Sequence, residues 1–126
     1  MKTNTIEQVE EKMRAAIEKW SWIVMRYGWN FDVNYVLGCD NMPAGSDVNT
    51  TGATSARWEY LKGTIWINLL ALQDESDDEI EKTAIHELFH LLLAPMGEVH
   101  NQTEKLEYTV TCLERLFFAV AHWEEK

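Results

Sequence analysis

Cysteine is scarce in this chain of 126 residues, and its two copies, Cys39 and Cys112, are far apart. Two distant cysteines provide neither a disulfide framework nor the closely spaced ligands of a cysteine-type zinc site. Unpaired thiols fit a reducing cytoplasm better than an oxidising compartment. The N-terminus leads into a charged segment without the apolar core of a signal peptide. We therefore expect a cytoplasmic protein.

Positive charge is also in short supply. Lysine and arginine number 11 against 21 acidic residues, which gives a formal net charge of −10, and the basic residues form no block. This balance disfavours nucleic acid and anionic membranes as partners. The chain also lacks the roughly 18 consecutive apolar residues of a membrane span. The sequence therefore predicts neither a nucleic-acid partner nor a membrane partner, and it leaves the oligomeric state open.

What the chain does contain is core-forming material, with 46% hydrophobic residues and six tryptophans. Its length is that of one ordinary domain, so we expect residues 1–126 to form a single domain. No internal repeat or low-complexity segment is visible. Hydrophobic periodicity and turn signals then divide the chain into elements.

The N-terminal part reads as one helix followed by a strand. Thr5 and Gln8 have the spacing of a capping box, and apolar residues recur at helical spacing up to Tyr27, where Gly28 is a plausible stop. From residues 29 to 37 apolar residues alternate with polar ones, which predicts a strand. The polar segment 38–52 is predicted to be a long loop.

The remaining elements are two strands and two helices. Strands are predicted at 54–61 and 64–70. We expect them to form a hairpin, because two alternating runs flank the short turn Lys62-Gly63. Helices are predicted at 76–94, before Pro95, and from 101 to about 123. The order helix, strand, strand, strand, helix, helix indicates a small α+β fold with a three-stranded, mainly antiparallel sheet.

The first of these two helices carries the sequence His86-Glu87-Leu88-Phe89-His90, which spells H-E-x-x-H. Residues four apart lie on one face of a helix, so both imidazoles can reach one metal ion at the 2.0–2.1 Å that zinc prefers. Glu87 is turned by about 100° from His86, beside the ion and able to take a proton from a bound water. The competing interpretation is a core helix with two hydrogen-bonded histidines and a paired glutamate.

A catalytic zinc site usually has three protein ligands and one open position. The downstream candidates are Glu98, His100, Glu104, Glu107 and Glu114. A third histidine in the pattern H-E-x-x-H-x-x-G-x-x-H is excluded, because Met96 and Leu93 occupy the required histidine and glycine positions.

Glu107 is the preferred candidate among these five, because it borders the apolar stripe of the last helix. His100 is the main alternative. Glu104 is interpreted as a solvated capping residue. For Glu114 we expect a role behind the ligands or in a surface ion pair.

These residues carry a resemblance to a known family. Thr83 to Leu92 resembles the active-site consensus of zincin metallopeptidases, and Glu107 to Leu113 is similar to the glutamate-bearing helix of their gluzincin branch. The likeness is greatest to compact ImmA/IrrE-type proteases and to small phage and prophage metallopeptidases, over about residues 55–120. Val110 and Leu113 stand where that helix has a small and an aromatic residue.

The resemblance implies a zincin-like fold, Zn²⁺ held by His86, His90 and Glu107, and Glu87 as catalytic base. Family members often add a side chain that steadies the tetrahedral intermediate. His100, Tyr108 and Tyr60 are the open candidates for that role, whereas His122 is interpreted as a surface or packing residue. The natural substrate is not specified.

The predicted function is therefore hydrolysis of a peptide or protein substrate by a zinc-activated water, with the substrate extended along the edge of strand 64–70. One alternative is a zinc-binding interaction or regulatory module without hydrolytic activity. Another is a metal-dependent nuclease with a third histidine six residues after His90. Met96 at that position and the net charge of −10 count against the nuclease.

Overall fold

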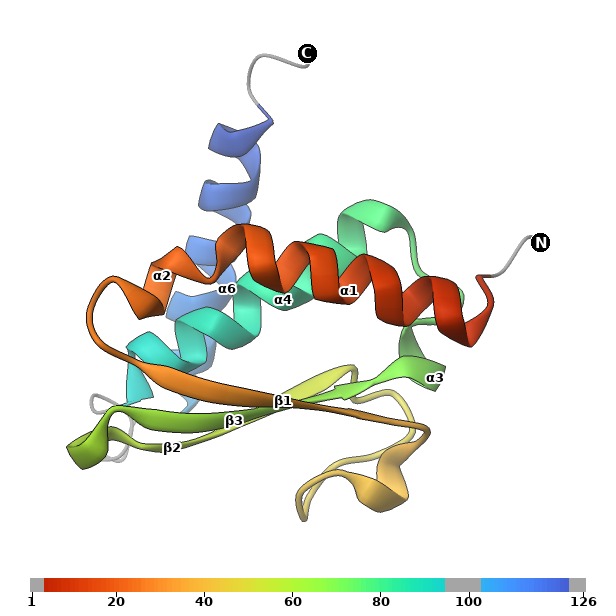
Figure 1. Ribbon diagram of the computed structural model, residues 1–126, viewed down its shortest axis with the longest axis horizontal. Coiled ribbons are helices and arrows are strands. Elements are labelled where there is room, and N and C mark those ends of the chain that lie inside the picture. The colour runs from red at the N-terminus through yellow and green to blue at the C-terminus, as the bar shows by residue number, and fades with distance from the viewer. Residues whose placement is uncertain (1–3, 95–102, 123–126) are drawn as a thin grey trace.

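The computed structural model describes residues 4–94 and 103–122. These residues form an α+β fold, with helices on one face of a three-stranded mixed sheet (Figure 1). No helix in this part of the chain combines the length and apolar character needed to cross a bilayer. The elements in chain order are α1 (Ile6–Trp20), α2 (Trp22–Met25), β1 (Asn30–Val36), η1 (Cys39–Asn41), β2 (Gly52–Arg57), η2 (Trp58–Tyr60), β3 (Lys62–Asn68), α3 (Leu69–Leu72), α4 (Asp77–Leu92) and α6 (Thr103–Ala121).

The predicted N-terminal helix is confirmed over most of its length but divides at Ser21 into α1 and α2. The capping box is present: Gln8 N donates to Thr5 Oγ1 at 3.1 Å, and Thr5 N donates to Gln8 Oε1 at 2.9 Å. The apolar stripe of α1 is buried as expected. The segment ends at Gly28, whose φ of 93° lies in the left-handed region that glycine adopts without strain.

The sheet has the strand order β1-β3-β2. β2 and β3 pair antiparallel, which confirms the predicted hairpin, whereas β1 and β3 pair parallel, so the expected mainly antiparallel sheet is wrong. After β1, the segment 37–51 passes the sheet position next to β1 and leads to β2. The β2–β3 hairpin then places β3 between β1 and β2. Because β3 is central, it has no open edge, and the predicted substrate edge on strand 64–70 is also wrong.

The helix α4 packs against α1, α6 and β2. Its buried apolar residues Ile80, Ala84, Leu88 and Leu91 belong to the same hydrophobic core as the inner face of β3. Gly63 of β3 permits this approach, because a Cβ there would lie 2.1 Å from a side-chain carbon of Leu91. Helix and sheet are therefore in direct contact along α4.

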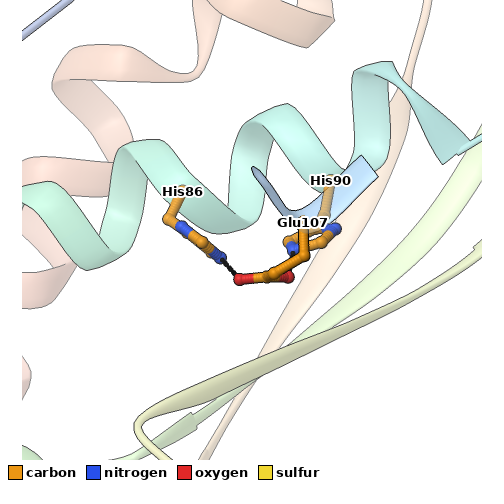
Figure 2. Close-up of side chains that lie close together, drawn as sticks. All are labelled: His86, His90 and Glu107. Atoms are coloured by element: carbon orange, nitrogen blue, oxygen red, sulfur yellow. Dashed lines mark hydrogen bonds and ion pairs between the residues drawn. The ribbon is translucent and has the colours of Figure 1, made fainter. Parts of the chain in front are cut away.

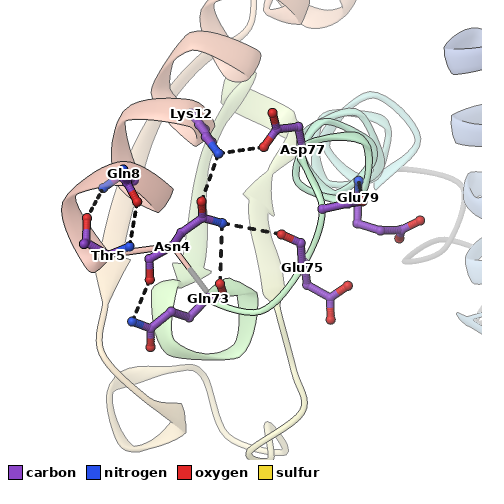
Figure 3. A network of polar contacts seen from close by, with 9 residues as sticks. Asn4, Thr5, Gln8, Lys12, Gln73, Glu75, Asp77 and Glu79 are labelled. Carbon is purple, nitrogen blue, oxygen red and sulfur yellow. Dashed lines mark hydrogen bonds and ion pairs between the residues drawn. The ribbon is translucent and has the colours of Figure 1, made fainter. Parts of the chain in front are cut away.

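A polar network joins the start of α1 to the start of α4 (Figure 3). Lys12 Nζ lies 2.7 Å from Asp77 Oδ1 and 2.9 Å from Asn4 Oδ1. Gln73 Nε2 donates to the carbonyl of Asn4 at 2.9 Å, and Asn4 N donates to the carbonyl of Gln73 at 3.1 Å. These bonds position the first turn of α4, two turns before its histidines.

Candidate metal centre

α4 begins where its sequence predicts, at Ser76. Glu79 N donates to Ser76 Oγ at 3.2 Å, and three acidic residues in the first turn complement the positive end of the helix dipole. The carboxylate of Glu79 forms an ion pair with Lys82 at 3.6 Å. The Ser76 side chain satisfies only the backbone N–H of Glu79. The helix then continues without interruption through both histidines.

His86 and His90 project from one face of α4 toward a single carboxylate on α6 (Figure 2). Nε2 of His86 lies 2.9 Å from Oε2 of Glu107, and Nε2 of His90 lies 2.8 Å from Oε1 of the same residue. The two imidazole rings have their centroids 4.9 Å apart. Glu107 lies 17 positions after His90 and 21 positions after His86. The three side chains converge because α6 packs against α4.

This donor set fits a divalent cation. One ligand atom from each of His86, His90 and Glu107 can be chosen so that all three lie within 4.8 Å of one another. Tetrahedral zinc with bonds of 2.0–2.1 Å spaces its ligand atoms by about 3.3 Å. The contacts of 2.9 and 2.8 Å between the carboxylate and the two rings are shorter than that spacing, so these side chains would shift on binding an ion. Two imidazoles and one carboxylate are also a set typical of catalytic zinc.

Behind this cluster, a second carboxylate holds the ring of His86. Nδ1 of His86 lies 3.1 Å from Oε1 of Glu114, where the ring N–H donates to the carboxylate. The side chain of Glu114 is only 12% exposed. A partner of this kind fixes the tautomer and orientation of a metal-binding histidine.

The environment of His86 favours its charged form. Burial alone lowers the pKa of the imidazole, but the hydrogen bond to Glu114 and the charges of Glu87 and Glu107 outweigh it and raise the pKa above its ordinary value. Both ring nitrogens face carboxylates, so a proton occupies Nε2 readily. A metal ion at this position would replace that proton.

Glu87 lies on the sheet side of α4 and is 5% exposed. Thr54 of β2 donates its hydroxyl hydrogen bond to Oε1 of Glu87 at 2.7 Å. Burial raises the pKa of the Glu87 carboxyl above its ordinary value, although the Thr54 bond and the nearby His86 and His90 act in the opposite direction. The hydrogen bond from Thr54 holds the carboxyl in one place beside the cluster.

Gly52, at the start of β2, makes room for this carboxyl. A Cβ at Gly52 would lie 2.8 Å from Oε2 of Glu87 and 3.1 Å from its Cδ, closer than side-chain atoms normally approach. A cavity of about 350 Å³ opens beside it and is lined by His86, Glu87, Glu107 and Glu114, together with Lys82 and residues 49–52. The Glu87 carboxyl, His86 and Glu107 thus face the same cavity.

The other sequence candidates have separate outcomes. Glu98, His100 and Met96 lie outside the described residues, as does the side chain of Glu104. Tyr60 and Tyr108 are 69% and 73% exposed, and neither lines the cavity. His122 is a packing residue as expected: its Nε2 lies 3.2 Å from Oε1 of Glu81, and its ring lies against Phe118.

The sequence interpretation missed the contribution of β2. Thr54 and Gly52 were assigned only to a strand and a loop, although strand alternation places Thr54 on the same face as the buried partner residue Ile65. A hydroxyl on a core-facing strand position requires a buried polar partner. That signal pointed to a polar group on the covering helix without identifying it as Glu87.

Comparison with protein-family models, curated proteins and solved structures finds no match for this chain.

Proposed function

We propose that this protein is a zinc-dependent peptidase. The observation that supports the proposal is the convergence of His86, His90 and Glu107 from two helices, with the buried carboxyl of Glu87 lining the same cavity. The H-E-x-x-H sequence and the resemblance to gluzincins point to the same chemistry. Zinc bound by such ligands lowers the pKa of a bound water toward about 7 and polarises the scissile carbonyl.

The roles of the chain's own residues follow from their positions. Glu87 accepts a proton from the attacking water and delivers it to the leaving amine, as a general acid–base catalyst. Thr54 holds the Glu87 carboxylate by its 2.7 Å hydrogen bond. Glu114 orients His86 from the opposite side of its ring. Thr54 and Glu114 are thus positioning residues.

The substrate is placed along the outer edge of β2. Asn68 N donates to the carbonyl of Thr51 at 2.9 Å, so odd-numbered residues of this segment point their backbone groups toward β3. By alternation, the N–H and C=O groups of Gly52, Thr54 and Ala56 point away from β3, past the cavity. An extended peptide paired with them by backbone hydrogen bonds would pass beside Glu87.

The test compares the wild-type chain with Glu87→Gln in a digest of a mixed quenched-fluorescence peptide library, with zinc content measured on both proteins. Glu87→Gln is expected to retain zinc and to lose about 10²- to 10⁴-fold in turnover, the usual contribution of general acid–base catalysis. Glu11→Gln, at an exposed position of α1, is the matched control and keeps full activity. Full activity in Glu87→Gln would reject the assignment.

One observation favours the alternative of a zinc-binding module without hydrolytic activity. Burial raises the pKa of Glu87, which opposes the ionised form that a general base requires. Zinc binding by the wild-type chain without cleavage of any library peptide would establish this alternative. Cleavage abolished by Glu87→Gln would exclude it.

A further inference from the structure

The outer edge of β1 lies on the opposite side of the sheet from β2, because the strand order is β1-β3-β2 (Figure 1). Asn30 N donates to the carbonyl of Leu61 at 2.8 Å, so the even-numbered residues of β1 face β3. Successive residues alternate, and the N–H and C=O groups of Phe31, Val33 and Tyr35 therefore point outward. No strand of the described residues pairs with them.

This edge lacks most of the features that normally prevent strand addition, and its one charged residue is Asp32. Natural edge strands are shortened, bulged or interrupted by proline or lysine. β1 is seven residues long and contains no proline or lysine, and it pairs with β3 in one continuous register from Asn30 to Val36. Its three outward residues offer a straight row of backbone donors and acceptors.

A groove runs beside the edge, between α1 and β1. It encloses about 470 Å³ and is lined by the apolar side chains of Ile17, Phe31, Val33 and Tyr35, with Ser21 and charged residues at its rim. A strand added at the usual spacing of about 4.8 Å from β1 would direct every second side chain into this groove. Apolar side chains at alternate positions fit it.

The charge around the groove is negative. Arg14 lies over the Tyr35 ring, 4.5 Å from its centroid, and donates to Glu10 at 3.0 Å, so its charge is compensated. Glu18 and Asp32 are exposed, and no described residue forms an ion pair with either. The chain as a whole carries −10.

We propose that the β1 edge and its groove bind an extended segment of another protein, in which apolar residues alternate with lysine or arginine. The backbone of this segment pairs with Phe31, Val33 and Tyr35. Its apolar side chains enter the groove under α1, and its basic side chains lie on the open face beside Asp32. A second copy of the chain fits less well, because it would bring the same acidic rim.

The bound segment would leave the candidate metal centre open, since the two lie at opposite edges of the sheet. The site would thus hold the protein to a partner while β2 remains accessible. This proposal is independent of metal binding, and its test is performed on the metal-free chain.

The probe is an acetylated and amidated peptide of alternating lysine and valine, matched in length to the seven residues of β1. Binding is followed by chemical-shift changes of the backbone amides in a two-dimensional NMR titration. The amides of Phe31, Val33 and Tyr35 are expected to shift and to become protected from solvent exchange. A glutamate–valine peptide of equal length is expected to bind at least tenfold more weakly.

Two variants of the experiment separate charge from backbone pairing. Asp32→Lys is expected to weaken binding of the lysine–valine peptide by about twofold to fivefold, in line with exposed ion pairs, and to improve binding of the glutamate–valine peptide. Asp40→Lys, an equal charge change at an exposed position outside the groove, should have little effect. A lysine–valine peptide N-methylated at every residue, which lacks all backbone donors, should not bind the wild-type chain.

In the peptide titrations, three results would overturn the proposal. They are the absence of shifts in β1 at millimolar peptide, equal binding of the lysine and glutamate peptides, and unchanged binding after N-methylation. Concentration-dependent shifts in β1 without peptide, together with a dimer in analytical ultracentrifugation, would assign the edge to a second copy and likewise reject the proposal.

Discussion

Zinc should stabilise this protein against heat through the cluster of His86, His90 and Glu107. Ligand at a hundredfold excess over its dissociation constant adds about 2.7 kcal/mol to the free energy of unfolding. Unfolding entropy near the midpoint is about 2.1 cal/mol/K per residue, or about 0.26 kcal/mol/K for a chain of 126 residues. The expected rise in Tm is therefore about 10 °C.

The assay is tryptophan fluorescence during thermal unfolding, with chelator-treated protein before and after addition of zinc. His86→Asn and Glu107→Gln each remove one donor and should reduce the shift to a small fraction of the wild-type value. His122→Asn is the matched control, because His122 lies against Glu81 and Phe118 and not in the cluster. This variant is expected to keep the zinc-induced shift, whatever its starting Tm.

A zinc-induced shift below about 2 °C, less than a fifth of the value derived from linkage, would refute the reasoning. An undiminished shift in His86→Asn would refute it as well, because the stabilising ion would then be bound elsewhere. Mixing should be done at about pH 8, since the raised pKa of His86 means that protons compete with the metal at lower pH.

Three further predictions concern neighbouring residues. Thr54→Val removes the hydrogen bond that lowers the pKa of Glu87, so the acidic limb of the kcat/KM profile should move to higher pH, whereas Thr54→Ser should leave it in place. Gly52→Ala places a Cβ 2.8 Å from the Glu87 carboxyl and should destabilise the protein by about 1–3 kcal/mol in urea unfolding, with an unchanged midpoint contradicting the packing. Burial opposes ionisation of Glu81, but hydrogen bonds from Trp20 and others lower its pKa below the ordinary 4.5. The ionised carboxylate therefore stabilises the folded protein above pH 4.5, and this contribution is lost as pH falls through the lowered pKa. Glu81→Gln should flatten this acid dependence of Tm.

Much of the helical framework could be predicted from the sequence, because its signals are local. The capping residues Thr5 and Ser76 both cap their helices, and the i, i+4 spacing places His86 and His90 on one face of α4. Glu107 could be chosen as the neighbour of the two histidines because it borders a stripe that includes the fully buried Val110. Each of these inferences depends on residues within a few turns of one another.

The sheet could not be ordered in the same way. Alternation identifies strands but does not say which neighbour each one takes, and β1 pairs with β3 across a separation of about thirty residues. The central position of β3 therefore had no signal in the local pattern. The same limitation hid the contact between Thr54 and Glu87, which joins residues 33 positions apart.

α6 both seals the core and supplies Glu107. Its residue Val110 is fully buried, and its Phe117 lies edge-on against Phe89 of α4, with ring centroids 5.0 Å apart. An ion bound between α4 and α6 would consequently be released faster when the last helix moves away from its neighbour. The dissociation rate of the metal would then report how often α6 opens. Phe117→Ala would speed ion release although Phe117 supplies no ligand atom.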